Sequence, residues 1–145
     1  MLLAALPLVA AFSLIAQFLP QDMLQEQELV TLFGDVSKEG NLETILLIAL
    51  AAVVVAPICE EFLFRGYFYP VLKRYIGAVG AMLMAGGLFA LMHANLASLP
   101  GLFALAICLT LAFESSGTIL VPMVMHALFN ALSLLMLYLR AQGVI

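Results

Sequence analysis

The fold is decided by one stretch, residues 42–65, which reads LETILLIALAAVVVAPICEEFLFR. It is apolar as far as Cys59 apart from Glu43 and Thr44, and two glutamates and an arginine follow almost at once. A helix needs about 20 mostly apolar residues to cross a bilayer. Ionisable groups at the end of such a segment are costly, so they indicate either a functional site or a closely paired cluster.

The composition of the whole chain also indicates a membrane protein. The 145 residues are 66% hydrophobic and 10% charged, whereas a soluble domain is about half apolar and about a quarter charged. The net charge of −4 comes without the clustered Lys and Arg of a nucleic-acid-binding surface, so we expect no nucleic-acid partner. Cys59 and Cys108 form no spaced metal-binding pattern, and we interpret both as packing residues.

Other apolar segments of the chain are also long enough, or nearly long enough, to cross a bilayer. Strict alternation of apolar and polar residues, the pattern of a membrane β-strand, is absent from all of them. Helices satisfy their own backbone hydrogen bonds in lipid, so we predict an all-α, polytopic transmembrane helical bundle with about five spans. The predicted spans are residues 1–19, 42–59, 76–96, 98–113 and 118–139.

The charges between the spans suggest three regions and an orientation. We expect a first span with an acidic extramembrane loop at residues 1–41, a core at 42–139, and a short tail at 140–145. The loop at 20–43 has six acids against Lys38 alone, whereas the connection at 65–75 carries Arg65, Lys73 and Arg74. Positive residues stay on the cytoplasmic side. We therefore place the 65–75 connection inside, and the acidic loop outside as a solvated connector.

The polar groups after the second span can be interpreted as chemistry. Glu61 and Arg65 are one helical turn apart, so the guanidinium can bind the Glu61 carboxylate in a bidentate contact. Glu60 then remains unpaired and can serve as a base in a low-dielectric setting. Pro57, three residues earlier, predicts a kink that opens room for water. An interfacial acid pair with a snorkelling arginine explains the same spacing.

Two histidine motifs lie in later spans. His93 follows Phe89 by four residues, and Asn130 follows His126 by four, so each pair shares a helix face. An imidazole and an amide so placed can both donate to one oxygen, as in an oxyanion hole. A core histidine and an interhelical hydrogen-bond pair are the structural alternatives. Pro122, four residues before His126, predicts a second kink.

Together the three motifs resemble those of the CAAX-protease and bacteriocin-processing family of intramembrane peptidases, also called the Abi family, with its type II CAAX prenyl endopeptidases. That family is marked by E-E-x-x-x-R, F-x-x-x-H and H-x-x-x-N on successive transmembrane helices. Here the motifs read EEFLFR at 60–65, FALMH at 89–93 and HALFN at 126–130. The resemblance covers roughly residues 42–139. It implies a multi-pass membrane enzyme that cleaves peptide bonds.

The resemblance also implies a substrate class and a role for each polar side chain. Water activation falls to Glu60 and His93, oxyanion stabilisation to His126 and Asn130, and the supporting ion pair to Glu61 and Arg65. The substrate would be a peptide or protein, either prenylated or a bacteriocin precursor, in the plasma membrane of a prokaryote. We expect no cofactor. Zinc held by Glu60, His93 and His126 is the alternative, although an asparagine amide is not a usual zinc ligand.

Several alternatives stay open at this level. Relatives usually have more spans before the glutamate pair, so the chain is either a minimal member or a fragment. Glu60 lies near the inner end of its predicted span and His93 near the outer end of the next. Their meeting requires a tilted or displaced third helix or a span that begins differently, and Gly86 and Gly87 are candidate places for a break. A non-catalytic immunity or partner-binding membrane protein could keep the same polar network. A proton-coupled carrier is disfavoured because no inverted repeat is visible.

Overall fold

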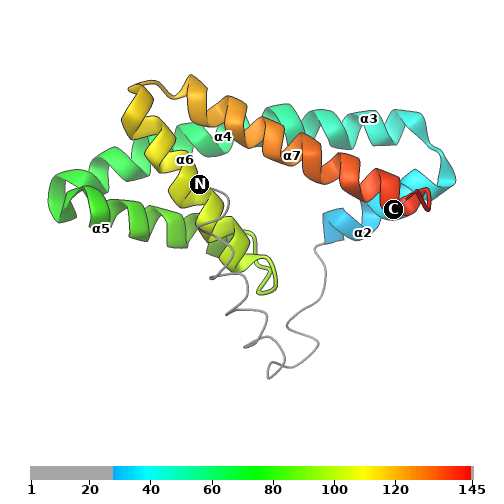
Figure 1. Ribbon diagram of the computed structural model, residues 1–145, viewed down its shortest axis with the longest axis horizontal. Helices are drawn as coiled ribbons and strands as arrows, with labels where there is room; N and C mark the ends of the chain where they lie inside the picture. The colour runs from blue at the N-terminus through cyan, green and yellow to red at the C-terminus, as the bar shows by residue number, and fades with distance from the viewer. Residues whose placement is uncertain (1–27, 145) are drawn as a thin grey trace.

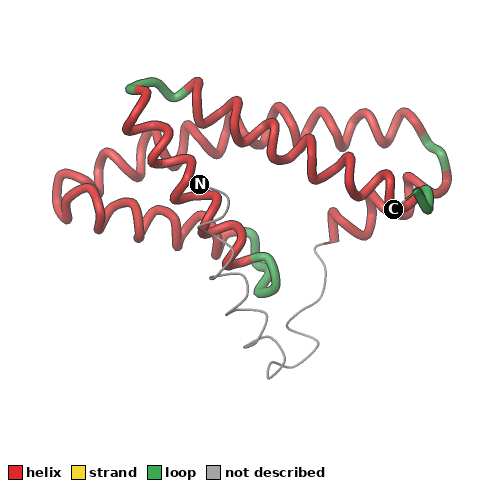
Figure 2. Tube along the Cα trace, in the orientation of Figure 1, coloured by secondary structure: helices red, strands yellow, loops and turns green. Residues whose placement is uncertain are grey.

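The computed structural model describes residues 28–144, so the predicted span at residues 1–19 lies outside the described part. Within 28–144 every regular element is a helix, which confirms the all-α prediction (Figures 1 and 2). The elements are α2 (Glu28–Glu39), α3 (Leu42–Leu50), η2 (Ala51–Val55), α4 (Ala56–Glu61), η3 (Phe62–Phe68), α5 (Tyr69–Met92), α6 (Leu99–Ser116) and α7 (Leu120–Ala141), where η marks a π-helix.

Three helices in the described part are long and apolar enough to cross a membrane: Leu42–Met92, Leu99–Ser116 and Leu120–Ala141. Their large apolar side chains face outward; Leu120 and Leu128 on α7, for example, are 65% and 58% exposed. An exterior of this kind is typical of a lipid-facing surface. The predicted spans at 98–113 and 118–139 are therefore confirmed, with small shifts at their ends.

The first of these helices runs unbroken from Leu42 to Ile76, about 50 Å at 1.5 Å per residue. The 65–75 connection, which we predicted to be a loop, is therefore helical. Its charges looked like loop charges, but two of them have partners within the bundle. Arg65 pairs with Glu61, and Lys73 Nζ lies 2.6 Å from Glu114 Oε2 on α6.

The chain reverses direction at Gly77, inside α5, where φ is 73° and ψ is 171°. This backbone conformation is essentially restricted to glycine. The two arms on either side of Gly77 then run back past each other (Figure 1). Phe64 on the first arm and Phe89 on the second are nearly equidistant in sequence from Gly77, and their ring centroids lie 5.2 Å apart. The third predicted span accordingly begins after Gly77, at residue 78, and its helix ends at Met92.

This hairpin explains how Glu60 and His93 can meet, although the predicted spans placed them at opposite sides of the membrane. Glu60 precedes Gly77 by almost the same length of chain as separates Gly77 from His93, so the reversal brings both side chains to the same level. Gly86 and Gly87 are regular helical positions, and the predicted break there is wrong. Gly86 instead allows close packing, because a Cβ at this position would lie 3.4 Å from the Phe103 ring on α6.

Both π-helical segments end two residues before a proline. The N–H of Ala56 bonds to the carbonyl of Ala51, and the N–H of Tyr69 bonds to the carbonyl of Phe64, so both bonds span five residues. Pro57 and Pro70 follow directly. A proline ring clashes with the carbonyl four residues earlier, and a wide turn relieves that clash.

Pro122 behaves differently from Pro57. It is the third residue of α7, in the first turn, where backbone N–H groups need no partner within the helix. No residue of α7 leaves the helical conformation, so the second predicted kink is absent. Ser98 is the N-cap residue of α6, and Pro100 lies in the first turn of this helix.

Residues 28–39 correct the prediction of a solvated connector, because they form α2, which packs against α3 and α7. Phe33 and Val36, three residues apart, are 3% and 9% exposed. The side chain of Gln142 donates to the carbonyl of Ser37 at 2.8 Å and ties the end of α7 to α2. The acidic residues of this stretch had obscured its apolar face.

Candidate active site

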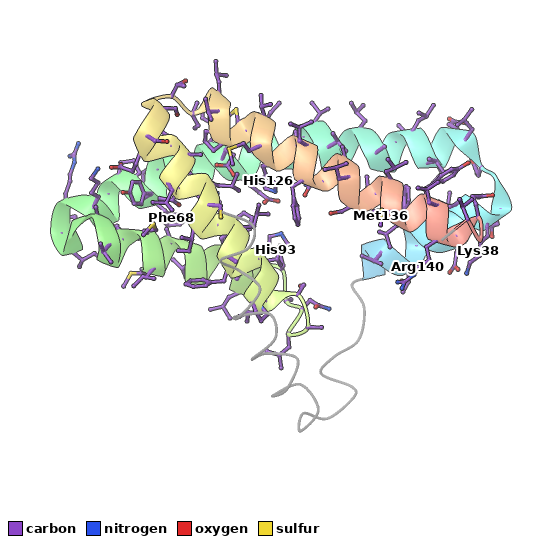
Figure 3. All side chains as sticks on the ribbon, viewed as in Figure 1. Lys38, Phe68, His93, His126, Met136 and Arg140 are labelled. Carbon is purple, nitrogen blue, oxygen red and sulfur yellow. The ribbon has the colours of Figure 1, made fainter. Side chains whose placement is uncertain are left out.

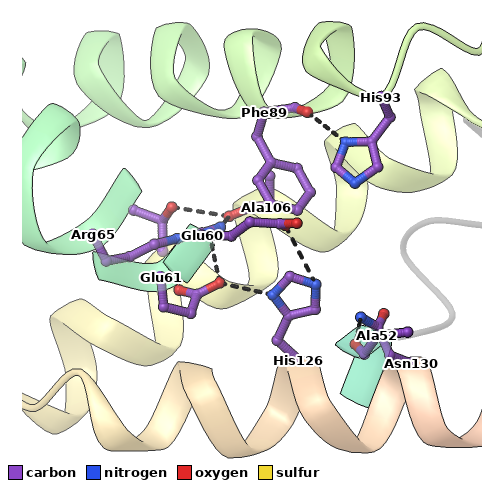
Figure 4. A network of polar contacts seen from close by, with 10 residues as sticks. Ala52, Glu60, Glu61, Arg65, Phe89, His93, Ala106, His126 and Asn130 are labelled. Atoms are coloured by element: carbon purple, nitrogen blue, oxygen red, sulfur yellow. Dashed lines mark hydrogen bonds and ion pairs between the residues drawn. The ribbon is translucent and has the colours of Figure 1, made fainter. Parts of the chain in front are cut away.

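The three motifs converge in the middle of the bundle (Figure 4). Glu60 and Glu61 come from α4, Arg65 from η3, His93 from the C-terminal end of α5, and His126 and Asn130 from α7. Figure 3 shows His93 and His126 near the middle of the molecule and Lys38 and Arg140 at one end.

Glu61 is the centre of a fully buried network. Its Oε1 accepts a hydrogen bond from Arg65 Nη1 at 2.8 Å and lies 3.0 Å from His126 Nδ1. A carboxylate only accepts, so Nδ1 of His126 donates. The side chains of Glu61, Arg65 and His126 are 0%, 2% and 3% exposed. Glu61 therefore serves as an anchor that fixes the His126 ring.

Arg65 departs from the predicted bidentate contact. Its second terminal nitrogen, Nη2, donates to the backbone carbonyl of Ala106 on α6 at 2.8 Å. The guanidinium thus links the glutamate pair to α6 as well as neutralising Glu61. A side-chain motif does not reveal a backbone acceptor on another helix, so this second link could not be read from the sequence.

Glu60 is arranged differently from its neighbour. Its side chain is 27% exposed, and its Oε2 has no hydrogen-bond partner among the described residues. Nε2 of His126 lies 3.8 Å from this oxygen, beyond hydrogen-bond reach. Most buried polar atoms have a partner, so a free carboxylate oxygen here indicates a place for a ligand atom or a water.

His93 points its free nitrogen toward the same space. Its Nδ1 lies 2.8 Å from the carbonyl oxygen of Phe89, which can only accept. Nδ1 therefore carries a proton, and Nε2 is the ring nitrogen left for a further contact. In Figure 4 the His93 ring and the Glu60 carboxylate face a common space.

Phe89 is the wall of the site, a role that the sequence alone did not reveal. The side chain is completely buried. Its ring centroid lies 4.9 Å from that of His93 and 5.6 Å from that of His126, and Arg65 Cζ lies 5.3 Å away. The Phe89 ring therefore contacts both imidazoles and the guanidinium and limits how closely they can approach one another. Its position four residues before His93 was the available signal.

Asn130 lies one turn beyond His126. Its Nδ2 donates to the carbonyl oxygen of Ala52 in η2 at 2.8 Å. An amide nitrogen has two hydrogens, so one N–H remains for a ligand. Beside this contact is an apolar hollow of about 350 Å³, lined by Leu47, Ile48, Ala51, Ala52 and Ala56.

The predicted zinc alternative finds no ligand set. The part of the chain from residue 28 to 144 contains no group of three or more His, Cys, Asp or Glu side chains placed to hold a metal ion. Glu60, His93 and His126 thus do not fit zinc as they stand, and no step below passes through a metal. The expectation of no cofactor stays a prediction.

Comparison with known proteins decides the family. Residues 42–132, more than half of the chain, match the family of type II CAAX prenyl endopeptidase Rce1-like proteins. The chain belongs to this Rce1-like family. No curated protein and no solved structure matches the chain. The matched residues contain all three motifs, and the protein is an integral membrane member of a CAAX-type peptidase family.

Proposed function

We propose that the protein hydrolyses peptide bonds within the membrane, with Glu60 as the base that activates the attacking water. One observation carries this assignment. Of two adjacent carboxylates, Glu61 is fully buried and bonded through Oε1 to Arg65 and His126, whereas Glu60 is 27% exposed and its Oε2 lies 3.8 Å from His126 Nε2 without a hydrogen bond. A general base must be free to take a proton.

The reaction proceeds from a water held between the Glu60 carboxylate and Nε2 of His93. Glu60 takes one proton of this water, while His93 accepts a hydrogen bond from the other. The hydroxide attacks the peptide carbonyl carbon, and the carbonyl π-electrons move onto its oxygen. When the tetrahedral intermediate collapses, the C–N bond breaks and the proton held by Glu60 passes to the leaving amine.

The developing oxyanion is stabilised by Nε2–H of His126 and the second N–H of Asn130. Because Nδ1 of His126 already donates to Glu61, a donor at Nε2 makes the ring an imidazolium. The cluster then holds two carboxylates, one guanidinium and one imidazolium, with a net charge of zero. A neutral sum supports this protonation state, since an uncompensated charge is costly inside a membrane.

The substrate is a peptide or protein with an apolar segment next to the cleaved bond. The apolar hollow beside Asn130 supports this choice. A prenylated C-terminus and a bacteriocin precursor both meet the requirement. We place the protein in the plasma membrane of a prokaryote, with residues 65–75 toward the cytoplasm.

Purified protein in detergent, given prenylated peptides and bacteriocin-leader peptides, tests the proposal. Cleavage is expected in the presence of a chelator and is expected to be lost in Glu60→Gln. Undiminished cleavage by Glu60→Gln would remove the base assignment, and cleavage that is lost with chelator and restored by zinc would require a metal. An immunity or partner-binding protein would instead keep its biological phenotype in Glu60→Gln.

A further inference from the structure

Asn130 is held by an acceptor that a regular helix would not offer. Carbonyl groups inside a helix normally accept the N–H of a later residue of the same helix. The carbonyl of Ala52 lies within η2, in the middle of the long first helix, yet it receives the side-chain amide of Asn130 from α7. Some feature of the local backbone leaves this oxygen available.

Two neighbouring facts explain the free carbonyl. The N–H of Ala56, which would bond to Ala52 in an α-helix, bonds to Ala51 because the turn is π-helical. In π-helical spacing the next donor, to Ala52, would come from residue 57. Residue 57 is a proline and has no N–H. Ala52 therefore loses both of its possible partners within the helix.

We propose that Pro57 is a positioning residue that acts through Ala52 to orient the amide of Asn130. This inference rests on the oxyanion role of Asn130 proposed above. A bare carbonyl at Ala52 selects the orientation of the side chain, because only the nitrogen end of the amide can bond to it. In the flipped orientation two oxygens would face each other, and the amide would present its oxygen to the oxyanion.

The same geometry connects both oxyanion donors to the first long helix, on either side of Pro57. His126 and Asn130 are one turn apart on α7, and both contact the first long helix. His126 is fixed by the side chain of Glu61, after Pro57, and Asn130 by the main chain of Ala52, before it. The wide turn at Pro57 thus separates the two anchors and leaves each of them free to bind α7.

Substitution of Pro57 by alanine restores a backbone N–H at this position, so the Ala52 carbonyl no longer lacks a partner within its own helix. In π-helical spacing residue 57 bonds to Ala52, and in α-helical spacing Ala56 does so; in both cases the carbonyl gains a partner within the helix. The amide of Asn130 then loses its exclusive acceptor. Misplacement of a positioned group by about 1 Å can cost roughly 100-fold in rate, so we expect kcat to fall about 10-fold to 100-fold with KM nearly unchanged.

The test combines a spectroscopic and a kinetic readout on the full chain in detergent. Selective ¹⁵N labelling of asparagine gives side-chain amide signals for Asn41, Asn95 and Asn130, and Asn130→Ala identifies the signal of interest. In Pro57→Ala this signal should lose the downfield shift of its bonded proton and exchange faster with water. Pro57→Val restores the same N–H with more side-chain volume and should behave alike. Pro100→Ala, in the first turn of α6, is the matched control and should change neither readout.

The kinetic arm uses Pro57→Ala in the Asn130→Ala background. If Pro57 acts through Asn130, the double variant has the kcat of Asn130→Ala alone. Additive losses in kcat would overturn the proposal, as would an unchanged Asn130 signal in both Pro57 variants. The amide signal requires no activity, so a failure of this link can be told apart from a failure of the peptidase proposal.

Discussion

The two adjacent glutamates allow a matched test, because the same substitution at each should give opposite results. Glu60→Gln removes the proposed base, which contributes about 10²-fold to 10⁴-fold to kcat, or about 3–5 kcal/mol of activation free energy. Its side chain is 27% exposed and its Oε2 has no hydrogen-bond partner among the described residues, so this substitution should lower the Tm much less than Glu61→Gln does. Activity and stability are therefore separated at this position.

Glu61→Gln reverses the pattern. Its Oε1 receives Arg65 at 2.8 Å and His126 at 3.0 Å, and all three side chains are almost fully buried. The glutamine keeps an acceptor oxygen but removes one of the two negative charges that balance Arg65 and the His126 imidazolium. Breaking one partner of a buried ion pair costs about 3–5 kcal/mol, so we expect a large fall in Tm, with loss of cleavage following from loss of the fold.

Both variants are measured by thermal unfolding and by peptide cleavage in the same detergent. The reasoning fails if Glu60→Gln cleaves at the wild-type rate, or if Glu61→Gln unfolds at the wild-type temperature. An exchange of the two results would assign the base to Glu61. Arg65 would then have to be released from Glu61 before the reaction.

Further predictions concern the framework of the site. Gly77→Ala meets no atom within 4 Å but forces alanine into a glycine conformation, so the free energy of unfolding should fall by about 1–3 kcal/mol; an unchanged denaturation midpoint would contradict this. Arg65→Lys cannot hold both a carboxylate and the α6 carbonyl with one nitrogen, so about 1.5–3 kcal/mol of stability should be lost in the same measurement. Phe89→Ala leaves a cavity between the imidazoles, so the free energy of unfolding should fall by about 3–5 kcal/mol and most of the kcat should be lost. Ala51→Phe fills the apolar hollow and should raise KM without changing kcat, whereas the exposed Ala78→Phe should change neither.

The apolar runs predicted the helices well where lipid contact sets the sequence pattern. The spans at 98–113 and 118–139 correspond to α6 and α7, because continuous hydrophobicity is what a bilayer requires of a helix. The same criterion misled us at residues 65–75. Charges there suggested a loop, but Arg65 is buried against Glu61, and Lys73 pairs with Glu114 of α6 at the surface of the bundle. Hydropathy cannot distinguish a charge in a solvated loop from one that is paired on a helix.

The turn at Gly77 had a local signal that the search for spans overlooked. Two basic residues, Lys73 and Arg74, precede the glycine within about one turn, which is typical of a helix C-terminus. The π-helical turns had a weaker signal in Pro57 and Pro70. Whether a proline produces a kink, a wide turn or nothing depends on its place in the helix, as Pro122 in the first turn of α7 demonstrates.

The separation of the motifs along the chain becomes intelligible once the hairpin is known. The proposed base and the proposed second proton-handling group must face one substrate atom, but Glu60 and His93 lie far apart in the sequence. Because the chain reverses at Gly77, the two side chains meet when they lie equally far from Gly77 along the sequence, however far apart they are from each other. α7 then runs antiparallel to the first arm, so His126 meets Glu61 while Asn130, farther along, meets Ala52, which lies farther back. Each of these polar contacts thus fixes how far one helix is shifted along the other. The buried ion pair, the aromatic wall and the amide contact fix the same register independently, which explains how few polar residues can hold the candidate active site together in an otherwise apolar bundle.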